Sequence, residues 1–314
     1  MSGPTAVQGM TRLLVAPRFD GVRLDVFLAG ATTLSRRAAR RLLGDGLVWR
    51  NGSAIRVQSR TVETGDVIDV LLPPHELGVE REPAIERPAV LHHDPWLLVA
   101  AKPAGVLAAP AERMAPDELA FDQQVLLAVA LETGRRPFLR MVHRLDRTTS
   151  GAVLFARCRE ALAPLSRAWK EGGVERVYLA VVEGQPAKDH AEIDLPIARD
   201  RSHAWRFTTD PGGQPSRTLY RVAARLVGDL ALLECRLDTG RTHQVRVHLA
   251  ALGHPVLGDR LYGSRRADEV GRALLHAWSL GLPHPKSGEL LHVTCPPPDD
   301  LRPYMPGGLG PEGS

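Results

Sequence analysis

The chain has 314 residues, 44% of them hydrophobic and 24% charged, which suffices for one large domain or two domains of unequal size. It contains no run of the roughly eighteen apolar residues that a membrane helix needs and no N-terminal signal pattern, so we expect a cytoplasmic protein without a membrane partner. Lys and Arg (40) outnumber Asp and Glu (36), and the sequence isoelectric point of about 9.2 favours a polyanionic partner.

Pattern and composition divide the chain into five parts. Residues 1–18 show no hydrophobic period and are expected to form a disordered leader, and residues 303–314 a disordered, Pro- and Gly-rich tail. Residues 19–73 form a compact unit. Residues 74–89 combine prolines with acids as interdomain linkers do. Residues 90–302 form a second, larger domain.

The compact unit is predicted to contain two short helices and a small hairpin. Ser35 fits the N-cap of the second helix, and Gly44 or Gly46 can end that helix. Asn51-Gly52, between two β-prone runs, is a strong signal for a tight turn.

The second helix of this unit, in "LSRRAARRLL", carries arginines at i, i+1, i+4 and i+5. They are Arg36, Arg37, Arg40 and Arg41. All four project from one helical face, opposite Leu34, Ala38 and Leu42. A solvated charged face is one interpretation, but like charges at i,i+4 destabilise a helix, and this segment has no acid to relieve them. Phosphate binding is therefore the favoured interpretation.

The second domain is predicted to mix strands with helices, without an internal repeat. The expected strands are "WLLVAAKP", "GAVLFAR", "RVYLAVVEG" and "LALLECRL". Helical spacing of apolar residues occurs in "REALAPLSRAWKEG" and "RTHQVRVHLAALG".

The spacing of cysteines and histidines argues against a metal site. Cys158, Cys235 and Cys295 lie far apart without a CxxC pair, so neither a disulfide framework nor a zinc site is expected. Several histidines of the C-terminal half lack the HExxH pattern. They are His243, His248, His254 and His276. We expect no metal and no cofactor.

The stretch "HRLDRTTSG", residues 143–151, holds one carboxylate, Asp146, between two arginines. An Asx-type turn or an ion pair with Arg144 or Arg147 would explain an arbitrary Asp here. The stretch nevertheless resembles, residue for residue, the catalytic motif of the RluA-type pseudouridine synthases. Further blocks of that family occur in the right order: "KPAG" before the motif, and "RVYLAVVEG", "TGRTHQVRVHLAALGHPVLGD-LYG" and "LLHA" after it. The residues from "RLD" to "GDVIDV" resemble the S4 RNA-binding module.

This resemblance implies the pseudouridine synthase fold, an α+β fold with a mixed, largely antiparallel central sheet and flanking helices, preceded by a small α/β S4-like domain. It implies isomerisation of uridine in structured RNA, with 23S ribosomal RNA as the expected substrate because the S4-like module is typical of the large-subunit branch. Transfer RNA as substrate, and a non-catalytic S4-type RNA-binding or ribosome assembly protein, are the alternatives. A monomer is expected.

By the same resemblance, Asp146 is the nucleophile, which attacks either C1′ of the ribose or C6 of the base. A glycosidase would need two carboxylates, so the single acid favours isomerisation. Desolvation under RNA raises the pKa of an Asp unless a cation lies close, and the arginine that the family pairs with this Asp corresponds to Arg246. With Thr242 as N-cap, Arg246 would lie in the second turn of its helix. The alternative for Arg246 is a phosphate contact or a structural ion pair, and the phosphate contact suits Arg241 better.

Four further residues complete the expected site. The family places the tyrosine that corresponds to Tyr178 against the uracil, where it stacks and its hydroxyl is a candidate for proton transfer; a core tyrosine is the alternative. Arg144 is placed to fill the space of an extruded base. Leu275 would exclude water from the glycosidic bond, with an ordinary core leucine as the alternative. Lys102 in "KPAG" would meet phosphate, with a plain turn at the end of a strand as the alternative. The Ala-rich segment 106–124 departs from the family and leaves the choice of RNA open.

Overall fold

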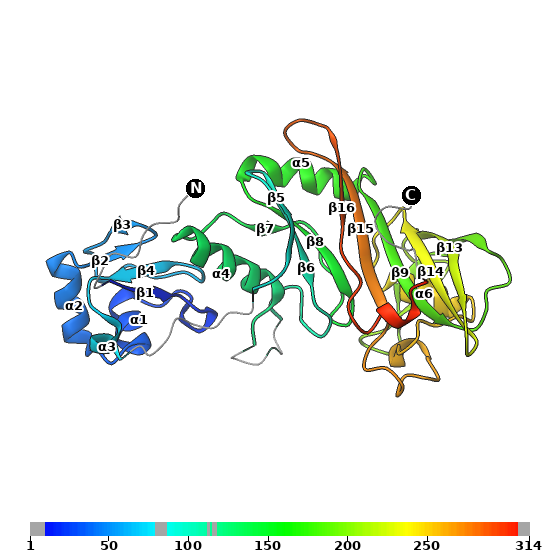
Figure 1. Cartoon of the computed structure of the whole chain (residues 1–314), viewed down its shortest axis with the longest axis horizontal. Helices are drawn as coiled ribbons and strands as arrows, with labels where there is room; N and C mark the ends of the chain where they lie inside the picture. The colour runs from blue at the N-terminus through cyan, green and yellow to red at the C-terminus, as the bar shows by residue number, and fades with distance from the viewer. Residues whose placement is uncertain (1–9, 79–86, 112–113, 115–117, 307–314) are drawn as a thin grey trace. The chain divides into compact units, whose positions relative to one another are not determined.

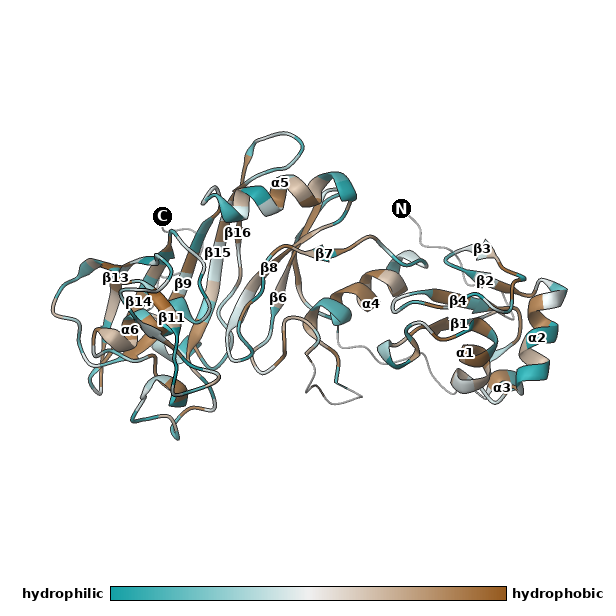
Figure 2. Ribbon diagram, turned by 180° about the vertical axis from the view of Figure 1, so that it is seen from behind, coloured by the Kyte–Doolittle hydropathy of each residue, from teal (hydrophilic) through white to brown (hydrophobic). Residues whose placement is uncertain are grey.

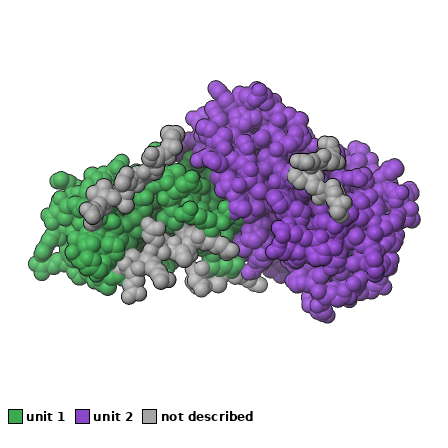
Figure 3. All heavy atoms as spheres, viewed as in Figure 1, with its two compact units in different colours: residues 1–88, 109–139 green, residues 89–108, 140–314 purple. Residues whose placement is uncertain are grey.

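The computed structural model describes residues 10–78, 87–111, 114 and 118–306. Contacts group the chain into two compact units, residues 1–88 with 109–139 and residues 89–108 with 140–314 (Figure 3). Segment 109–139 therefore groups with the N-terminal unit, whereas the sequence analysis assigned it to the second domain. No helix in the described part of the chain is long and apolar enough to cross a bilayer.

The first unit contains a small sheet with strand order β1-β4-β2-β3 and short helices beside it. Its strands are β1 (Thr11–Leu14), β2 (Val48–Arg50), β3 (Ser53–Ala54) and β4 (Val67–Val70). Its helices are the 3-10 helix η1 (Pro17–Phe19), α1 (Leu24–Ala31), α2 (Arg36–Asp45), α3 (Pro74–Leu77) and α4 (Phe121–Thr133). Phe27, Leu28, Leu43 and Ile68 lie fully buried in one core between α1, α2 and the sheet.

The local signals of this unit act as predicted. The Ser35 hydroxyl accepts a hydrogen bond from the Ala38 amide at 3.2 Å and caps α2. Gly46 ends α2 in the left-handed conformation, with φ of 76°. Asn51 and Gly52 both have positive φ, 51° and 78°, as a tight hairpin turn requires. The buried face of α2 differs from the prediction, because Ala39 and Leu43 make it while Ala38 is half-buried.

Two segments expected to be disordered contain packed structure, and the expected linker does so in part. Strand β1 lies inside the predicted leader, pairs antiparallel with β4 and buries Leu13. Leu77 of α3, within the predicted linker, joins the core of the first unit. The 3-10 helix η3 (Arg302–Tyr304) enters the predicted tail, and Tyr304 packs against buried leucines. Such short elements carry too few residues for a hydrophobic period. Residues 1–9, 79–86 and 307–314 lie outside the described residues.

The second unit is built on a ten-stranded sheet in which all pairs but one are antiparallel. The main path runs β10-β13-β14-β9-β15-β8-β6-β5 (Figure 1). Outside this path, β16 pairs with β15 and β7 pairs with β8. The strands from β5 to β9 are β5 (Val90–His93), β6 (Leu97–Lys102), β7 (Arg140–Met141), β8 (Ser150–Ala156) and β9 (Glu175–Glu183). The others are β10 (His190–Asp194), β13 (Arg217–Leu226), β14 (Leu230–Leu237), β15 (Leu275–Pro283) and β16 (Leu290–Thr294). A separate hairpin joins β11 (Ile197–Arg199) to β12 (Phe207–Thr209).

Helices α5 (Arg159–Lys170) and α6 (Gln244–Ala251) pack on this sheet as the sequence predicts. Ala161 and Leu165 of α5 lie in a core with residues of β6 and β8, and Val245 and Leu249 of α6 lie in a core with β9 and β14. Figure 2 shows hydrophobic colour concentrated along the central strands and both colours on α2. The predicted mixed, largely antiparallel fold is confirmed.

The parallel pair in the middle of the sheet brings two chain segments unusually close. Gly151, at the start of β8, has φ of 127°, and a Cβ there would lie 2.3 Å from the carbonyl oxygen of Ala277 in β15. Only glycine allows this approach. Tyr178 in β9 is the partner of Ala277 on the other side of β15. The loop that leads into Gly151 therefore ends close to Tyr178.

Candidate active site

The loop of residues 143–149 carries Asp146 and is held by hydrogen bonds from backbone amides and from two arginine side chains. The Gly105 amide donates to the Arg147 carbonyl at 2.7 Å, and the Arg147 Nε donates back to the Gly105 carbonyl at 2.8 Å. The Arg272 Nη1 donates to the Thr148 carbonyl at 3.1 Å. Asp146 closes a turn with Thr149, whose amide donates to the Asp146 carbonyl at 3.1 Å. The backbone that carries the Asp146 side chain is thus held in place.

Lys102 takes part in this anchoring instead of meeting phosphate. It is 1% exposed, and its Nζ donates to the carbonyls of Pro103, Val106 and Arg147 at 2.8, 2.7 and 3.3 Å. Burial lowers the pKa of Lys102 to about 8, although the negative charge of Asp146 acts in the opposite direction. This placement contradicts the predicted phosphate contact, because the ammonium has no access to a bound RNA. Lys102 ties the "KPAG" turn to the loop of Asp146.

Arg246 reaches Asp146 from the first turn of α6, not from the second. The residue before the helix is His243, with φ of 58° and no side-chain cap, and Thr242 is exposed. The predicted cap is therefore wrong by one residue. The Gln244 side chain instead fixes the segment before the helix: its Oε1 accepts from the Arg241 amide at 3.0 Å and from the Thr239 hydroxyl at 2.8 Å.

The guanidinium of Arg246 is shared between two carboxylates. Its Nη1 donates to Asp146 Oδ2 at 3.1 Å, while Nε and Nη2 donate to the two oxygens of Asp259 at 2.6 and 2.9 Å. The side chains of Arg246 and Asp259 are 7% and 1% exposed, whereas that of Asp146 is 26% exposed. Burial by itself would lower the pKa of Arg246, but the hydrogen bonds and charges of Asp259 and Asp146 raise it. The pairing expected from the resemblance is present in the geometry.

Three residues beside Arg246 and Asp146 were assigned no role in the sequence analysis: Asp259, Tyr262 and His243. Asp259 orients Arg246, and the Tyr262 ring lies beneath it, with 4.9 Å between Arg246 Cζ and the ring centroid. His243 lies between Tyr262 and Asp146. Asp259 and Tyr262 lie in "LGDRLYG", a block that carried the family resemblance, so the resemblance marked this segment but not its function.

The hydrogen bonds of His243 determine which of its two ring nitrogens carries the hydrogen. The Tyr262 hydroxyl accepts from the Phe207 amide at 3.0 Å and lies 2.8 Å from His243 Nδ1. Burial lowers the pKa of His243, and the nearby negative charge of Asp146 partly offsets this. For a neutral ring whose Nδ1 accepts the phenol proton, Nε2 carries the hydrogen. This Nε2 lies 3.8 Å from Asp146 Oδ2, so a small movement would bring a neutral donor to the carboxylate.

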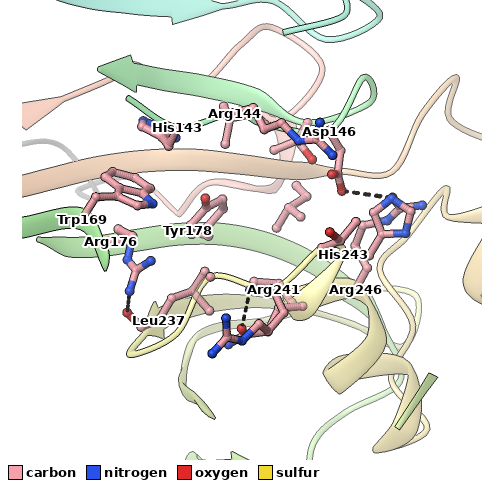
Figure 4. Close-up of a pocket in the computed structure, with 17 residues that line it drawn as sticks. His143, Arg144, Asp146, Trp169, Arg176, Tyr178, Leu237, Arg241, His243 and Arg246 are labelled. Carbon is pink, nitrogen blue, oxygen red and sulfur yellow. Dashed lines mark hydrogen bonds and ion pairs between the residues drawn. The ribbon is translucent and has the colours of Figure 1, made fainter. Parts of the chain in front are cut away.

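These residues surround a cavity of about 270 Å³. Arg144, Asp146, Tyr178, Arg241, Arg246 and Leu275 line it together with His243 (Figure 4). Asp146 is the one carboxylate among the described residues that line this cavity. Arg144 and Arg241 are exposed at its rim, and Leu275 is 4% exposed. The fold thus brings together residues that are up to about a hundred and thirty positions apart in the sequence.

Tyr178 forms one wall of the cavity. Burial raises the pKa of Tyr178 to about 12, and the charge of Asp146 acts in the same direction, against the opposing effect of Arg176. The phenol therefore stays protonated at neutral pH and offers a ring face and a hydrogen-bond donor.

The far end of the cavity contains residues outside the predicted site. His143 stacks on Trp169 with 3.7 Å between the ring centroids, and Arg176 lies over the same indole at 5.2 Å. His143 Nδ1 and Arg176 Nε are buried without a hydrogen-bond partner among the described residues. Arg176 Nη2 donates to the carbonyls of Leu237 and Asp238, both at 3.0 Å.

The arginine face of α2 differs from the expectation in its electrostatics. Asp25 of α1 accepts hydrogen bonds from Arg23, Arg36 and Arg40 at 3.1, 3.2 and 2.9 Å. Burial alone would raise the pKa of Asp25, but these arginines hold it well below its usual range. The acid that the helical segment lacks is thus supplied by α1, while Arg37 and Arg41 are exposed. Among the described residues, no three His, Cys, Asp or Glu side chains cluster as metal ligands would.

Comparison with known proteins gives relatives that are named as pseudouridine or pseudouridylate synthases. Residues 96–251 match the family described as RNA pseudouridylate synthase, and residues 22–68 match the S4 domain. An uncharacterized RNA pseudouridine synthase of Chloroflexus aurantiacus is 40% identical over 92% of this chain and 91% of its own. Ribosomal large subunit pseudouridine synthase D of Nitrosomonas europaea is 34% identical over 96% and 88%. Human RNA pseudouridylate synthase domain containing 1 has a solved structure similar to this chain, with a TM-score of 0.58, 28% identity and coverage of 69% and 86%.

Proposed function

The chain belongs to the RNA pseudouridine synthase family, and we propose that it isomerises specific uridines of 23S ribosomal RNA with Asp146 as the nucleophile. The family makes it an isomerase that acts on RNA, and its S4 domain is an RNA-binding module. Support for a ribosomal substrate comes from the relative of Nitrosomonas europaea, whose name states the large ribosomal subunit.

The reaction moves one glycosidic bond and gains or loses no atoms. The bond between N1 of uracil and C1′ of ribose breaks, the base turns, and a bond forms between C5 and C1′. The hydrogen of C5 leaves as a proton, and N1 takes up a proton. Asp146 forms a transient ester at C1′ or an adduct at C6, and either covalent bond is broken again before release.

Arg246 holds Asp146 in place when RNA covers the site. Its Nη1 donates to Asp146 Oδ2 at 3.1 Å, and Asp259 fixes the same guanidinium through Nε and Nη2. The carboxylate of Asp146 is thereby aimed by a rigid, positively charged group.

The walls of the cavity suit an extruded uracil. Tyr178 stacks on the base, and Leu275 excludes water that would hydrolyse the reactive intermediate. Arg144, two residues before Asp146, fills the space that the base leaves in the RNA helix. Arg241 contacts phosphate at the rim. The protonated phenol of Tyr178 acts as a donor and not as a base.

The observation that carries this proposal is the single carboxylate of the cavity, held by Arg246. The experiment is tritium release from C5-labelled uridine in transcribed 23S ribosomal RNA and in bulk transfer RNA. We expect release from ribosomal RNA by the wild type, and loss of at least about a thousandfold in Asp146→Asn, because catalysis by a nucleophile ends with its removal. Asp268→Asn, at an exposed carboxylate that does not line this cavity, is the matched control.

The other outcomes separate the alternatives. Release from transfer RNA alone would move the substrate and keep the chemistry. Full activity of Asp146→Asn would show that the nucleophile is wrongly assigned. Tight RNA binding without release from either RNA would favour the non-catalytic RNA-binding protein. The cytoplasmic location and the monomeric state stay predictions.

A further inference from the structure

A second cavity, of about 490 Å³, adjoins the active-site cavity, and we propose that it holds the nucleotide next to the target uridine in the RNA chain. The base of that nucleotide stacks on Phe207, and its phosphate lies between Arg199 and Arg241. This inference rests on the proposed function, since it assigns a subsite to the same substrate.

The two cavities share a wall. Gly240, Arg241 and Thr242 line both of them. Phe207, on the other side of the second cavity, contacts His243 edge to face with 5.6 Å between the ring centroids. His243 in turn lies 3.8 Å from Asp146. A ligand in the second cavity is thus separated from the catalytic carboxylate by one side chain, as a neighbour of the reacting nucleotide would be.

The charges that line the second cavity select an anion. Arg199 and Arg241 line it, and none of the described residues that line it is a carboxylate. The Arg199 guanidinium is fixed by Nε and Nη2, which donate to the Ala204 carbonyl at 3.2 and 2.7 Å. Arg241 Nε donates to the Pro215 carbonyl at 3.2 Å. Both guanidinium groups are thereby oriented while they remain exposed, which suits phosphate recognition.

The remaining walls suit a base. Phe207 is half-buried, so its ring is held in place and can stack on a base. The exposed Gln214 amide and Thr242 hydroxyl provide hydrogen-bond donors and acceptors. Gly212, Gly213 and Gly240 contribute walls without side chains, and a Cβ at Gly213 would lie 2.5 Å from the Ile197 carbonyl carbon. The close approach of these two backbone segments therefore leaves no room for a side chain at Gly213.

The hairpin β11–β12 offers a matched pair of variants. Arg199 lines the cavity, whereas Arg201, two residues later and also exposed, does not. Kinetics are measured with the full chain on transcribed 23S ribosomal RNA. We expect Arg199→Gln to raise KM about tenfold with kcat changed less than twofold, because a phosphate contact made in ground and transition state affects binding alone. Arg201→Gln should behave as the wild type.

A second measurement locates the RNA directly. The wild type is irradiated with a uridine pentanucleotide that contains one 4-thiouridine, and the cross-linked peptides are mapped by mass spectrometry. We expect a cross-link at Phe207 in the wild type that decreases several-fold in Arg199→Gln and persists in Arg201→Gln. Circular dichroism verifies that both variants are folded.

Two results would overturn the inference: equal KM in the two arginine variants, or a Phe207 cross-link that is absent or insensitive to Arg199→Gln. In either case the proposed function stands as long as the wild type forms pseudouridine. If the wild type forms none in any RNA, the proposed function fails and the subsite falls with it, which is a distinguishable outcome.

Discussion

Asp259 makes Arg246 a rigid group. A guanidinium whose Nε and Nη2 are both held by one buried carboxylate has a single orientation, and Nη1 then points at Asp146. The arrangement resembles the orientation of a catalytic base by a second buried acid in other enzymes, where the outer residue does not touch the substrate. Asp259 is thus a positioning residue.

Asp259→Asn is predicted to lower kcat by about 10- to 100-fold, because a misplaced arginine no longer aligns Asp146 with the sugar. KM for RNA should stay equal or fall, since one negative charge leaves the site. The free energy of unfolding should fall by roughly 3 kcal/mol, because the buried Arg246 loses the more buried of its two carboxylate partners. Steady-state kinetics and urea unfolding measure these effects.

Asp268→Asn, at an exposed carboxylate, serves as the control. It should leave kcat, KM and the free energy of unfolding unchanged. A rise in KM with an unchanged kcat in Asp259→Asn would contradict the positioning role, since it would indicate that Asp259 acts in binding only.

His276 makes folding stability depend on pH. Its Nε2 lies 3.0 Å from the Cys295 carbonyl and its Nδ1 lies 2.9 Å from the Ser150 hydroxyl, so Nε2 carries the hydrogen and Nδ1 accepts. Burial lowers the pKa of His276 to about 4 from an unperturbed 6.5. The unfolded chain therefore binds a proton that the folded chain does not. The stability is fully present above pH 6.5 and is lost progressively between pH 6.5 and about 4.

His276→Gln should flatten this dependence. Over that window the wild type is expected to lose up to about 1.4 kcal/mol of unfolding free energy per pH unit through this one residue. Urea unfolding at a series of pH values measures the slope in both proteins. Parallel slopes would mean that His276 titrates normally in the folded state.

At the scale of elements, α2 carries two kinds of arginine. Arg36 and Arg40 pair with the buried Asp25 and connect α2 to α1. Arg37 and Arg41 make no ion pair with any described residue, although all four arginines are exposed. The basic run thus combines a pair that shares the charge of Asp25 with a pair whose full charge is available for phosphate.

The double variant Arg37→Gln/Arg41→Gln should reduce the slope of log affinity against log salt by roughly 1 to 2 for 23S ribosomal RNA, because two phosphate contacts are lost. Arg36→Gln/Arg40→Gln should instead lower the melting temperature and change the slope less. Filter binding between 50 and 200 mM salt, with differential scanning calorimetry, separates these effects. Equal loss of slope in both variants would contradict the division.

Helix α6 shows how an element prediction can succeed while its start is misplaced. The apolar spacing predicts the helix, and Gly253 ends it with φ of 82°. The start depends on Gln244, whose side chain bonds Thr239 and Thr218. Since Thr218 lies in β13, the residue at which this helix begins is decided by packing and not by local preference.

At the scale of the whole molecule, the first unit is assembled from two distant chain segments. The Asn51 Oδ1 accepts from the amides of Val67 and Arg136, both at 2.9 Å. Arg136 also donates to the Thr64 carbonyl at 2.8 Å and pairs with Glu63 at 2.9 Å. The tight turn at Asn51 therefore anchors the segment that follows α4.

Asn51→Gly should preserve the turn, because glycine accepts positive φ, while it removes the amide contacts. We expect faster hydrogen exchange at the Val67 and Arg136 amides, by about tenfold, because each loses its hydrogen bond. Exchange measured by mass spectrometry on the full chain tests this. Unchanged exchange at Arg136 would show that its amide is protected without Asn51.

The sequence by itself determined the family, the α+β class, the principal strands and helices of the sheet, and Asp146 with Arg246 as its partner. The strands and helices depend on local periodicity and capping residues, whereas the family and the pairing of Asp146 with Arg246 came from the resemblance of several sequence blocks to that family. Only the tertiary structure decided that Asp259, Tyr262 and His243 complete the cluster, that Lys102 lies under the loop, that Asp25 pairs with two of the four α2 arginines, and that β1 joins the first sheet. Each of these depends on contacts between residues far apart in the chain, which hydrophobic pattern and local preference do not encode.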